Sequence, residues 1–191
     1  MEETRSRKAT FPRAERRDYG YDVKQVDAFM AKARRSYNNP DAGAPVTSKE
    51  VRAVAFDPAK GGYEPRAIDA ALDRIEDAFA ERERDALIAK HGEDQWLQGI
   101  SKLSTVLRAR MHRRRGERFR RPTSRNAISY DVEDVDRLCE ELLSYFEKDK
   151  PLSVDVVRRA VFRPAKGRNG YDEAQVDAFL DRVVELMAAI D

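Results

Sequence analysis

Residues 170–180 have the sequence Gly-Tyr-Asp-Glu-Ala-Gln-Val-Asp-Ala-Phe-Leu, and three other stretches of the chain repeat this pattern. These stretches are residues 20–30, 62–72 and 129–139. A pattern that recurs in this way indicates internal repeats, and we interpret the chain as four degenerate copies of one motif. In each copy an aspartate follows a tyrosine after six residues: Tyr21 and Asp27, Tyr63 and Asp69, Tyr130 and Asp136, Tyr171 and Asp177.

The copies share the signals of a helix N-terminus. Asp22, Asp131 and Asp172 precede an apolar pattern of helical period, where a carboxylate accepts hydrogen bonds from the unpaired amides of the first turn. Gln25 and Gln175 lie three residues further on, as a reciprocal capping box requires. Each copy therefore predicts an amphipathic helix with one buried stripe. The stripes include Phe29, Leu72, Leu138 and Phe179.

The spacing of the copies groups them in pairs. Tyr21 and Tyr63 are 42 residues apart, and Tyr130 and Tyr171 are 41 residues apart, whereas 67 residues separate the two pairs. We predict an all-α fold of four helix-hairpin repeats with exposed tips. The repeats form two short-plus-full pairs around a helical spacer.

The second copy of each pair has a short leading helix, followed by the turn sequence Pro-Ala-Lys-Gly. Thr47 and Ser153 cap these two helices, which we expect to end near Phe56 and Phe162. The first copies are shorter and lack such a helix, and Phe11 and Phe119 stand in the corresponding places.

The spacer is predicted to be helical. A helix that begins at Glu64 continues until Gly92, and a second begins after Asp94. Trp96 is expected in a core, with an interface or membrane contact as the alternative. We predict a flexible basic N-terminus at 1–10, a short repeat at 11–37, a full repeat at 46–84, the Arg-rich spacer at 85–118, a short repeat at 119–148 and a full repeat at 152–191.

The composition is typical of a soluble helical protein. Of the 191 residues 41% are hydrophobic and 38% are charged, and the 37 basic and 35 acidic side chains leave a net charge that identifies no partner. Cys139 lies on an apolar helix stripe, and a lone thiol forms no internal disulfide, which fits a reducing cytoplasm. No apolar run approaches the ~20 residues of a membrane-spanning helix, so we expect a cytoplasmic protein.

Basic residues are concentrated at the end of the spacer, which makes this stretch a candidate site for an anionic partner. One acidic residue, Glu117, interrupts the run. Phosphate attraction makes nucleic-acid binding through this stretch the alternative function, although the nearly neutral chain has no recognition-helix motif. A solvated face or a connector is the simpler interpretation. The arginines are Arg108, Arg110, Arg113, Arg114, Arg115, Arg118, Arg120, Arg121 and Arg125.

The sequence offers no constellation for catalysis. The two histidines, His91 and His112, both lie in the unrepeated spacer, and no nucleophile set, metal-ligand cluster or phosphate-binding glycine motif accompanies them. The repeated aspartates are expected to bond to the turn or to a neighbouring repeat, and the tyrosines to pack at the hairpin base. We therefore predict a protein that is not an enzyme and that uses no cofactor or metal.

A short helix that ends in Phe, a basic glycine-containing turn and then Gly-Tyr-Asp-x-x-x-Val-Asp-x-Phe-Leu resembles the lipid-binding domain of the DivIVA family of bacterial cell-division and polar-scaffold proteins. The match is most complete at residues 154–184, good at 48–79 and partial at 11–33 and 119–146. The resemblance implies a non-enzymatic scaffold or adapter at the inner face of the membrane, at septa or poles. Its expected partners are the division or growth machinery, an anionic membrane surface and further copies of itself.

The hairpin tips depart from the family pattern, in which an exposed Phe stands next to an Arg. Lys60 and Gly61 occupy these places in the second copy. We therefore expect electrostatic attachment to an anionic surface rather than insertion. Family members also have a long coiled coil after one domain, and here repetition takes the place of dimerisation. The candidate contact residues at the tips are Arg16, Arg17, Lys60, Lys166 and Arg168, and in the spacer Arg113, Arg114 and Arg115.

Overall fold

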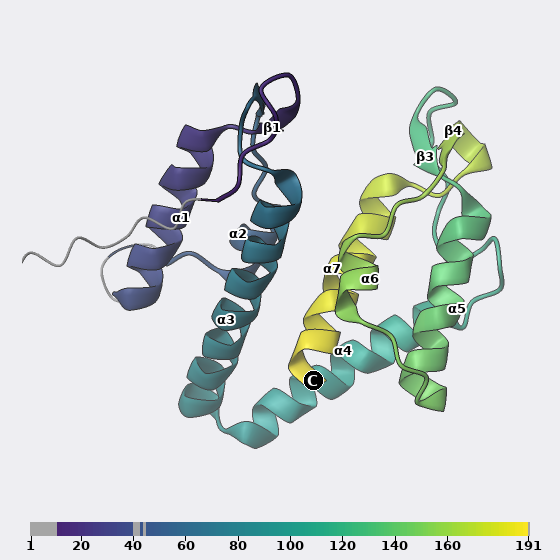
Figure 1. The fold of residues 1–191 in the computed structure, drawn as a ribbon. Coiled ribbons are helices and arrows are strands. Elements are labelled where there is room, and N and C mark those ends of the chain that lie inside the picture. The colour runs from purple at the N-terminus through teal and green to yellow at the C-terminus, as the bar shows by residue number, and fades with distance from the viewer. Residues whose placement is uncertain (1–10, 40–42, 44, 191) are drawn as a thin grey trace, which may run out of the picture. The chain divides into compact units, whose positions relative to one another are not determined.

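The computed structural model describes residues 11–39, 43 and 45–190. The chain divides between Ala86 and Leu87 into two compact units, which are described separately here as the first and the second unit. The structure is mostly helical, as predicted, although the described residues also form four strands of three residues each (Figure 1).

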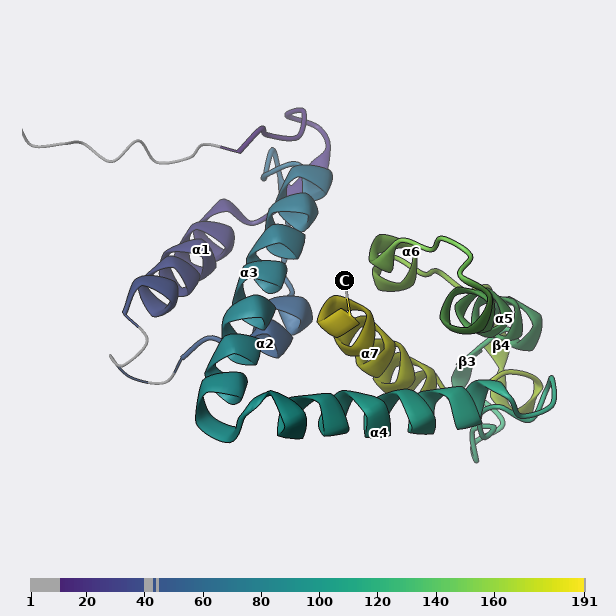
Figure 2. The same ribbon diagram turned by 90° about the horizontal axis from the view of Figure 1, so that it is seen from below.

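The first unit contains the elements β1 (Tyr19–Tyr21), α1 (Val23–Asn38), α2 (Ser48–Ala53) and β2 (Pro58–Lys60), and most of α3 (Pro65–His91). Helices α1 and α3 lie side by side in both ribbon views (Figures 1 and 2). Val26 of α1 and Ile68 of α3 are fully buried between them, and Val51 of α2 packs in a neighbouring cluster with Ala33 and Phe79. The core is therefore built from the predicted apolar stripes.

The second unit contains α4 (Glu93–Met111), β3 (Ile128–Tyr130), α5 (Val132–Lys148), α6 (Val154–Arg158), β4 (Pro164–Lys166), the 3-10 turn η1 (Gly167–Asn169) and α7 (Glu173–Ile190). Helix α7 contacts both α4 and α6 (Figure 2). One cluster of buried side chains joins Met111, Leu142, Val183 and Met187 from three helices. Helix α4, in the segment predicted as a spacer, thus contributes to this core, whereas Trp96 is only half-buried and lies outside it.

Antiparallel strand pairs join the two copies within each unit. Strand β1 pairs with β2, with Tyr19 opposite Lys60, and β3 pairs with β4, with Ile128 opposite Lys166. Each exposed tip is therefore made by strands from two copies (Figure 1). The sequence pattern predicts a tip on a single helix hairpin instead, because strands of three residues are too short for a detectable period-2 pattern.

The two copies cross at their Gly-Tyr steps. The backbone N–H of Tyr21 donates to the carbonyl of Tyr63 at 2.9 Å, and the N–H of Tyr63 donates to the carbonyl of Tyr21 at 2.9 Å. A Cβ atom on Gly20 would lie 2.3 Å from the Tyr63 carbonyl oxygen, and one on Gly62 would lie 2.4 Å from the Tyr21 oxygen. These glycines are needed because two backbones approach closely, whereas Gly61 has a positive φ of 62°, which favours glycine.

The short helices end earlier than predicted. Helix α2 ends at Ala53 and α6 ends at Arg158, so Phe56 and Phe162 lie beyond them in segments without regular secondary structure. These phenylalanines instead pack against tyrosines of the first copies. The ring centroids of Phe56 and Tyr21 are 5.6 Å apart, and those of Phe162 and Tyr130 are 5.1 Å apart. The reverse contacts join Phe11 to Tyr63 and Phe119 to Tyr171.

One of the two hydrogen bonds predicted for each capping box is confirmed. Asp22 Oδ1 accepts from the Gln25 N–H at 2.9 Å, and Asp172 Oδ1 accepts from the Gln175 N–H at 3.1 Å. The predicted reciprocal bond, from the Asp22 N–H to the Gln25 side chain, is wrong. The Asp22 N–H donates instead to the Asp57 carbonyl oxygen, and Gln25 Oε1 accepts from the Asp57 N–H at 2.8 Å. The second copy thus supplies the partners that a local box would have supplied.

We predict that Gly20→Ala lowers the free energy of unfolding by about 2–3 kcal/mol or more, because the new Cβ meets backbone that cannot move aside without breaking the strand pair. Urea denaturation followed by circular dichroism measures the change. The matched control is Gly99→Ala in α4, where an added Cβ meets no atom within 4 Å. This control should be neutral or stabilising by up to about 1 kcal/mol. Equal stability of the two variants would contradict the crossing.

Candidate functional site

Each repeated tyrosine meets the aspartate of the other copy in its unit. The Tyr63 hydroxyl donates to Asp27 Oδ1 at 3.0 Å, and the Tyr171 hydroxyl donates to Asp136 Oδ1 at 3.1 Å. The opposite pairs, which join Tyr21 to Asp69 and Tyr130 to Asp177, complete the exchange. The six-residue spacing therefore lets each copy offer a tyrosine hydroxyl as donor and an aspartate carboxylate as acceptor to the other copy in its unit. These contacts give the aspartates a structural role.

The tyrosines are held in the neutral form. Burial raises the pKa of Tyr171 and of Tyr130 to about 12, and the neighbouring aspartates add to both shifts. A phenol that stays protonated remains a hydrogen-bond donor at neutral pH. Burial likewise raises the pKa of the Cys139 thiol to about 12, so this thiol stays protonated as a core side chain.

Arg118 is a structural residue of the second unit, although it belongs to the basic stretch that was considered for anion binding. Its side chain is buried, its Nε donates to the Met111 carbonyl at 3.0 Å, and its Nη1 lies 3.2 Å from Asp136 Oδ1. Asp136 also accepts from the Gly116 N–H at 2.7 Å. This buried network fixes the loop after α4 and leaves Arg118 inaccessible to a partner.

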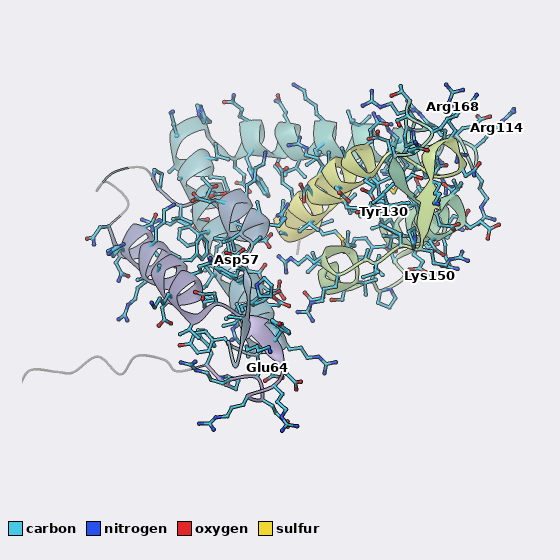
Figure 3. The ribbon with its side chains drawn as sticks, turned by 90° about the horizontal axis from the view of Figure 1, so that it is seen from above. Asp57, Glu64, Arg114, Tyr130, Lys150 and Arg168 are labelled. Atoms are coloured by element: carbon cyan, nitrogen blue, oxygen red, sulfur yellow. The ribbon has the colours of Figure 1, made fainter. Side chains whose placement is uncertain are left out.

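Other arginines of this stretch also have internal partners. Arg108 pairs with Glu147 at 2.8 Å, and Arg121 Nη1 donates to the Asn169 carbonyl at 3.1 Å. Among the predicted contact residues, Arg115 pairs with Glu140 at 3.0 Å. Arg113 and Arg114 are exposed and have no side-chain partner among the described residues, and Figure 3 shows Arg114 at the outer edge of the second unit.

The first tip is the end of the β1–β2 pair and includes Arg16, Arg17, Tyr19 and Lys60. Tyr19 is 62% exposed, and Lys60 Nζ lies 5.8 Å from the centre of its ring. Arg16 and Arg17 are exposed in the loop that leads into β1, and the backbone of Arg16 borders Gly61. The fold thus assembles three basic side chains and one exposed aromatic ring from two separate copies.

The second tip is the end of the β3–β4 pair and includes Arg125, Ile128, Lys166 and Arg168. Ile128 is 68% exposed and stands opposite Lys166 in the strand register. The backbone of Arg125 packs against Gly167, which lies between Lys166 and Arg168 in the sequence. Figure 3 labels Arg168 at the outer edge of this unit. The second tip therefore has the same construction as the first.

Sequence reasoning missed Ile128, the apolar member of the second tip, and assigned Arg125 to the Arg-rich stretch rather than to a tip. A usable signal was present, because Ile128 precedes Tyr130 by two residues, as Tyr19 precedes Tyr21. The tip residues predicted within each unit do lie together, whereas the spacer arginines 113–115 belong to the loop that follows α4.

The structure also bears on other kinds of site. In the described part of the chain, no group of three or more His, Cys, Asp or Glu side chains is placed to hold a metal ion. None of the helices among the described residues is both long and apolar enough to cross a membrane.

Comparisons with known proteins add no assignment. No family model matches the chain, and neither the curated proteins nor the solved structures gave a match.

An ion-pair cluster next to the second tip makes stability depend on pH. Arg163 Nε lies 2.9 Å from Asp134 Oδ2, and the Arg163 backbone N–H donates to the same oxygen at 3.0 Å. These bonds hold the pKa of Asp134 below its ordinary value. A lowered carboxyl pKa contributes stability that is present above the unfolded-state pKa and is lost as the pH falls.

We predict that Arg163→Gln destabilises the protein at neutral pH, because Asp134 loses one of its two cationic partners and keeps only Arg137. The difference from the wild type should narrow below about pH 4, where the unfolded carboxylate takes up a proton. Urea denaturation over a pH series measures this difference. Arg120→Gln is the control, because the exposed Arg120 side chain has no partner among the described residues. A stability difference that does not vary with pH would contradict the role of Asp134.

Proposed function

We propose that this chain is a non-enzymatic peripheral scaffold or adapter that resembles DivIVA-domain proteins and contacts an anionic membrane through its two tips. The observation that supports this proposal is the same cross-strand pair at both tips, Tyr19 opposite Lys60 and Ile128 opposite Lys166. Large apolar side chains that are mostly exposed beside basic ones are a recurrent feature of interaction surfaces. Two matched examples in one chain favour a shared function.

The proposed architecture is two pairs of degenerate repeats, each pair forming one unit. The exchange of tyrosine and aspartate contacts between copies supports this arrangement, because Tyr63 bonds to Asp27 while Tyr171 bonds to Asp136 in the same sense. A single copy would leave these polar groups and its apolar stripe without partners. The second copy in each pair therefore takes the place that another subunit would fill in a shorter protein.

The chemistry of the tips suits the interface of an anionic bilayer. Each basic side chain near such a surface contributes about 1 kcal/mol, and tyrosine partitions to the headgroup region because its ring is apolar and its hydroxyl is polar. Tyr19 and Ile128 supply the large apolar side chains that the Pro-Ala-Lys-Gly turns lack. Shallow insertion beside the lysines is thus part of the proposal, in addition to electrostatic attachment.

The biological role is proposed from the sequence resemblance. Protein of this type would act at the inner face of the membrane, at septa or poles, and would link division or growth machinery to that surface. Self-association of the chain belongs to the same proposal. Nucleic-acid binding is less well supported, because Arg108, Arg118 and Arg121 are held by internal bonds and the free arginines are few.

Co-flotation with vesicles tests the proposal. The wild type should float with vesicles that contain phosphatidylserine and should remain behind with pure phosphatidylcholine, and high salt should weaken the binding. A variant with Lys60→Glu, Lys166→Glu and Arg168→Glu should fold normally and lose binding, because three attractive charges become repulsive.

The matched control replaces Lys24, Lys49 and Lys102 with Glu, which makes the same change in net charge at exposed positions on α1, α2 and α4. This control should lose much less binding than the tip variant. Equal losses would point to net charge rather than to the tips. Wild-type protein that binds neither vesicle would overturn the membrane role.

A further inference from the structure

The two tips differ in their acidic neighbours. In the first tip, Glu15 and Asp18 are exposed within the loop that also presents Arg16 and Arg17. The loop is closed by backbone bonds, since the Asp18 N–H donates to the Glu15 carbonyl at 2.9 Å and the Gly61 N–H donates to the Asp18 carbonyl at 3.0 Å. These bonds fix the backbone of Glu15 and Asp18 in the same loop as Arg16 and Arg17.

The second tip has no such neighbours. Acidic residues are absent from the segments 119–130 and 163–170, which build this tip. Arg125, Lys166 and Arg168 are exposed, and their side chains have no carboxylate partner among the described residues. The basic charge of the second tip is therefore not offset, whereas Glu15 and Asp18 offset part of the charge of the first tip, to which the exposed Arg13 also contributes by donating to the Gly61 carbonyl at 3.2 Å.

The apolar members of the tips do not distinguish them. Tyr19 is 62% exposed and Ile128 is 68% exposed, and each stands opposite a lysine in the same strand register. Burying either side chain in a bilayer interface removes a similar share of apolar surface from water. The difference in charge therefore decides which tip binds an anionic surface more strongly.

We infer that the second tip, with Arg125, Ile128, Lys166 and Arg168, is the primary contact for anionic lipid and that Glu15 and Asp18 keep the first tip a weaker one. This inference rests on the proposed membrane function. Each unit charge near an anionic leaflet changes affinity by about fivefold, so two carboxylates weaken the first tip by about 30-fold relative to the second. The chain then approaches the membrane with its second unit.

Matched triple variants test this order. The full chain is titrated with phosphatidylcholine vesicles that contain phosphatidylserine, and pure phosphatidylcholine vesicles serve as the reference. Arg125→Gln with Lys166→Gln and Arg168→Gln should reduce affinity by about 30-fold, because the weaker first tip then carries the binding. Arg16→Gln with Arg17→Gln and Lys60→Gln removes the same charge from the first tip and should reduce affinity by less than about fivefold. Circular dichroism confirms that both variants fold.

A rescue variant tests the cause of the asymmetry. Adding Glu15→Gln and Asp18→Gln to the second-tip variant should restore affinity to within about fivefold of the wild type, because the first tip then carries uncompensated basic charge. Failure to rescue, or a larger loss in the first-tip variant, would overturn the inference. The proposed function would survive both results, since the wild type would still bind.

Two further outcomes are separable. If the wild type binds but neither triple variant is weakened, attachment lies outside the tips, for example at Arg113 and Arg114, and the inference fails. If the wild type binds duplex DNA with a steep salt dependence and no vesicle, the proposed membrane function itself fails.

Discussion

The structure depends on the close crossing of two Gly-Tyr segments in each unit. At this crossing the two tyrosines exchange both backbone hydrogen bonds, and the segments approach so closely that Gly20 and Gly62 have no room for a side chain. In the second unit Ser129 takes the place of one glycine and is fully buried against Gly170. This close approach of the two backbones fixes the register of one segment against the other. The strand pairs and the contacts between tyrosine and aspartate depend on that register.

The tips are a consequence of the same constraint. Since β1 must pair with β2 for Tyr21 to meet Tyr63, the residues before each tyrosine are placed opposite the lysine of the Pro-Ala-Lys turn. An apolar residue and a lysine thereby become neighbours although about 40 residues separate them in the sequence. A surface of this kind can change its charge through loop residues such as Glu15 without any change in the crossing, so one framework presents two tips of different charge.

The two units also keep one geometry with different chemistry. In the first unit the side chain of Gln25 bonds to Asp57, and in the second the corresponding pair is Asp134 and Arg163. At the same junction the second unit has an Arg–Asp ion pair where the first unit has an amide that donates to the Asp57 carboxylate. The ion pair holds the pKa of Asp134 below its ordinary value, so the stability that this pair contributes is lost as the pH falls.

The sequence by itself determined the helices, their caps and their buried stripes, because these depend on local periodicity and on groups a few residues apart. It identified Asp27, Asp136 and their counterparts as structural, and it placed Lys60 and Lys166 at exposed tips. Only the tertiary structure decided which partner each group meets. The bond between Gln25 and Asp57 and the pairing of Ile128 with Lys166 join segments that are far apart in the chain. The early ends of α2 and α6 and the burial of Arg118 also depend on tertiary packing. Local patterns contain no information about such distant contacts, which form only when the chain packs in three dimensions.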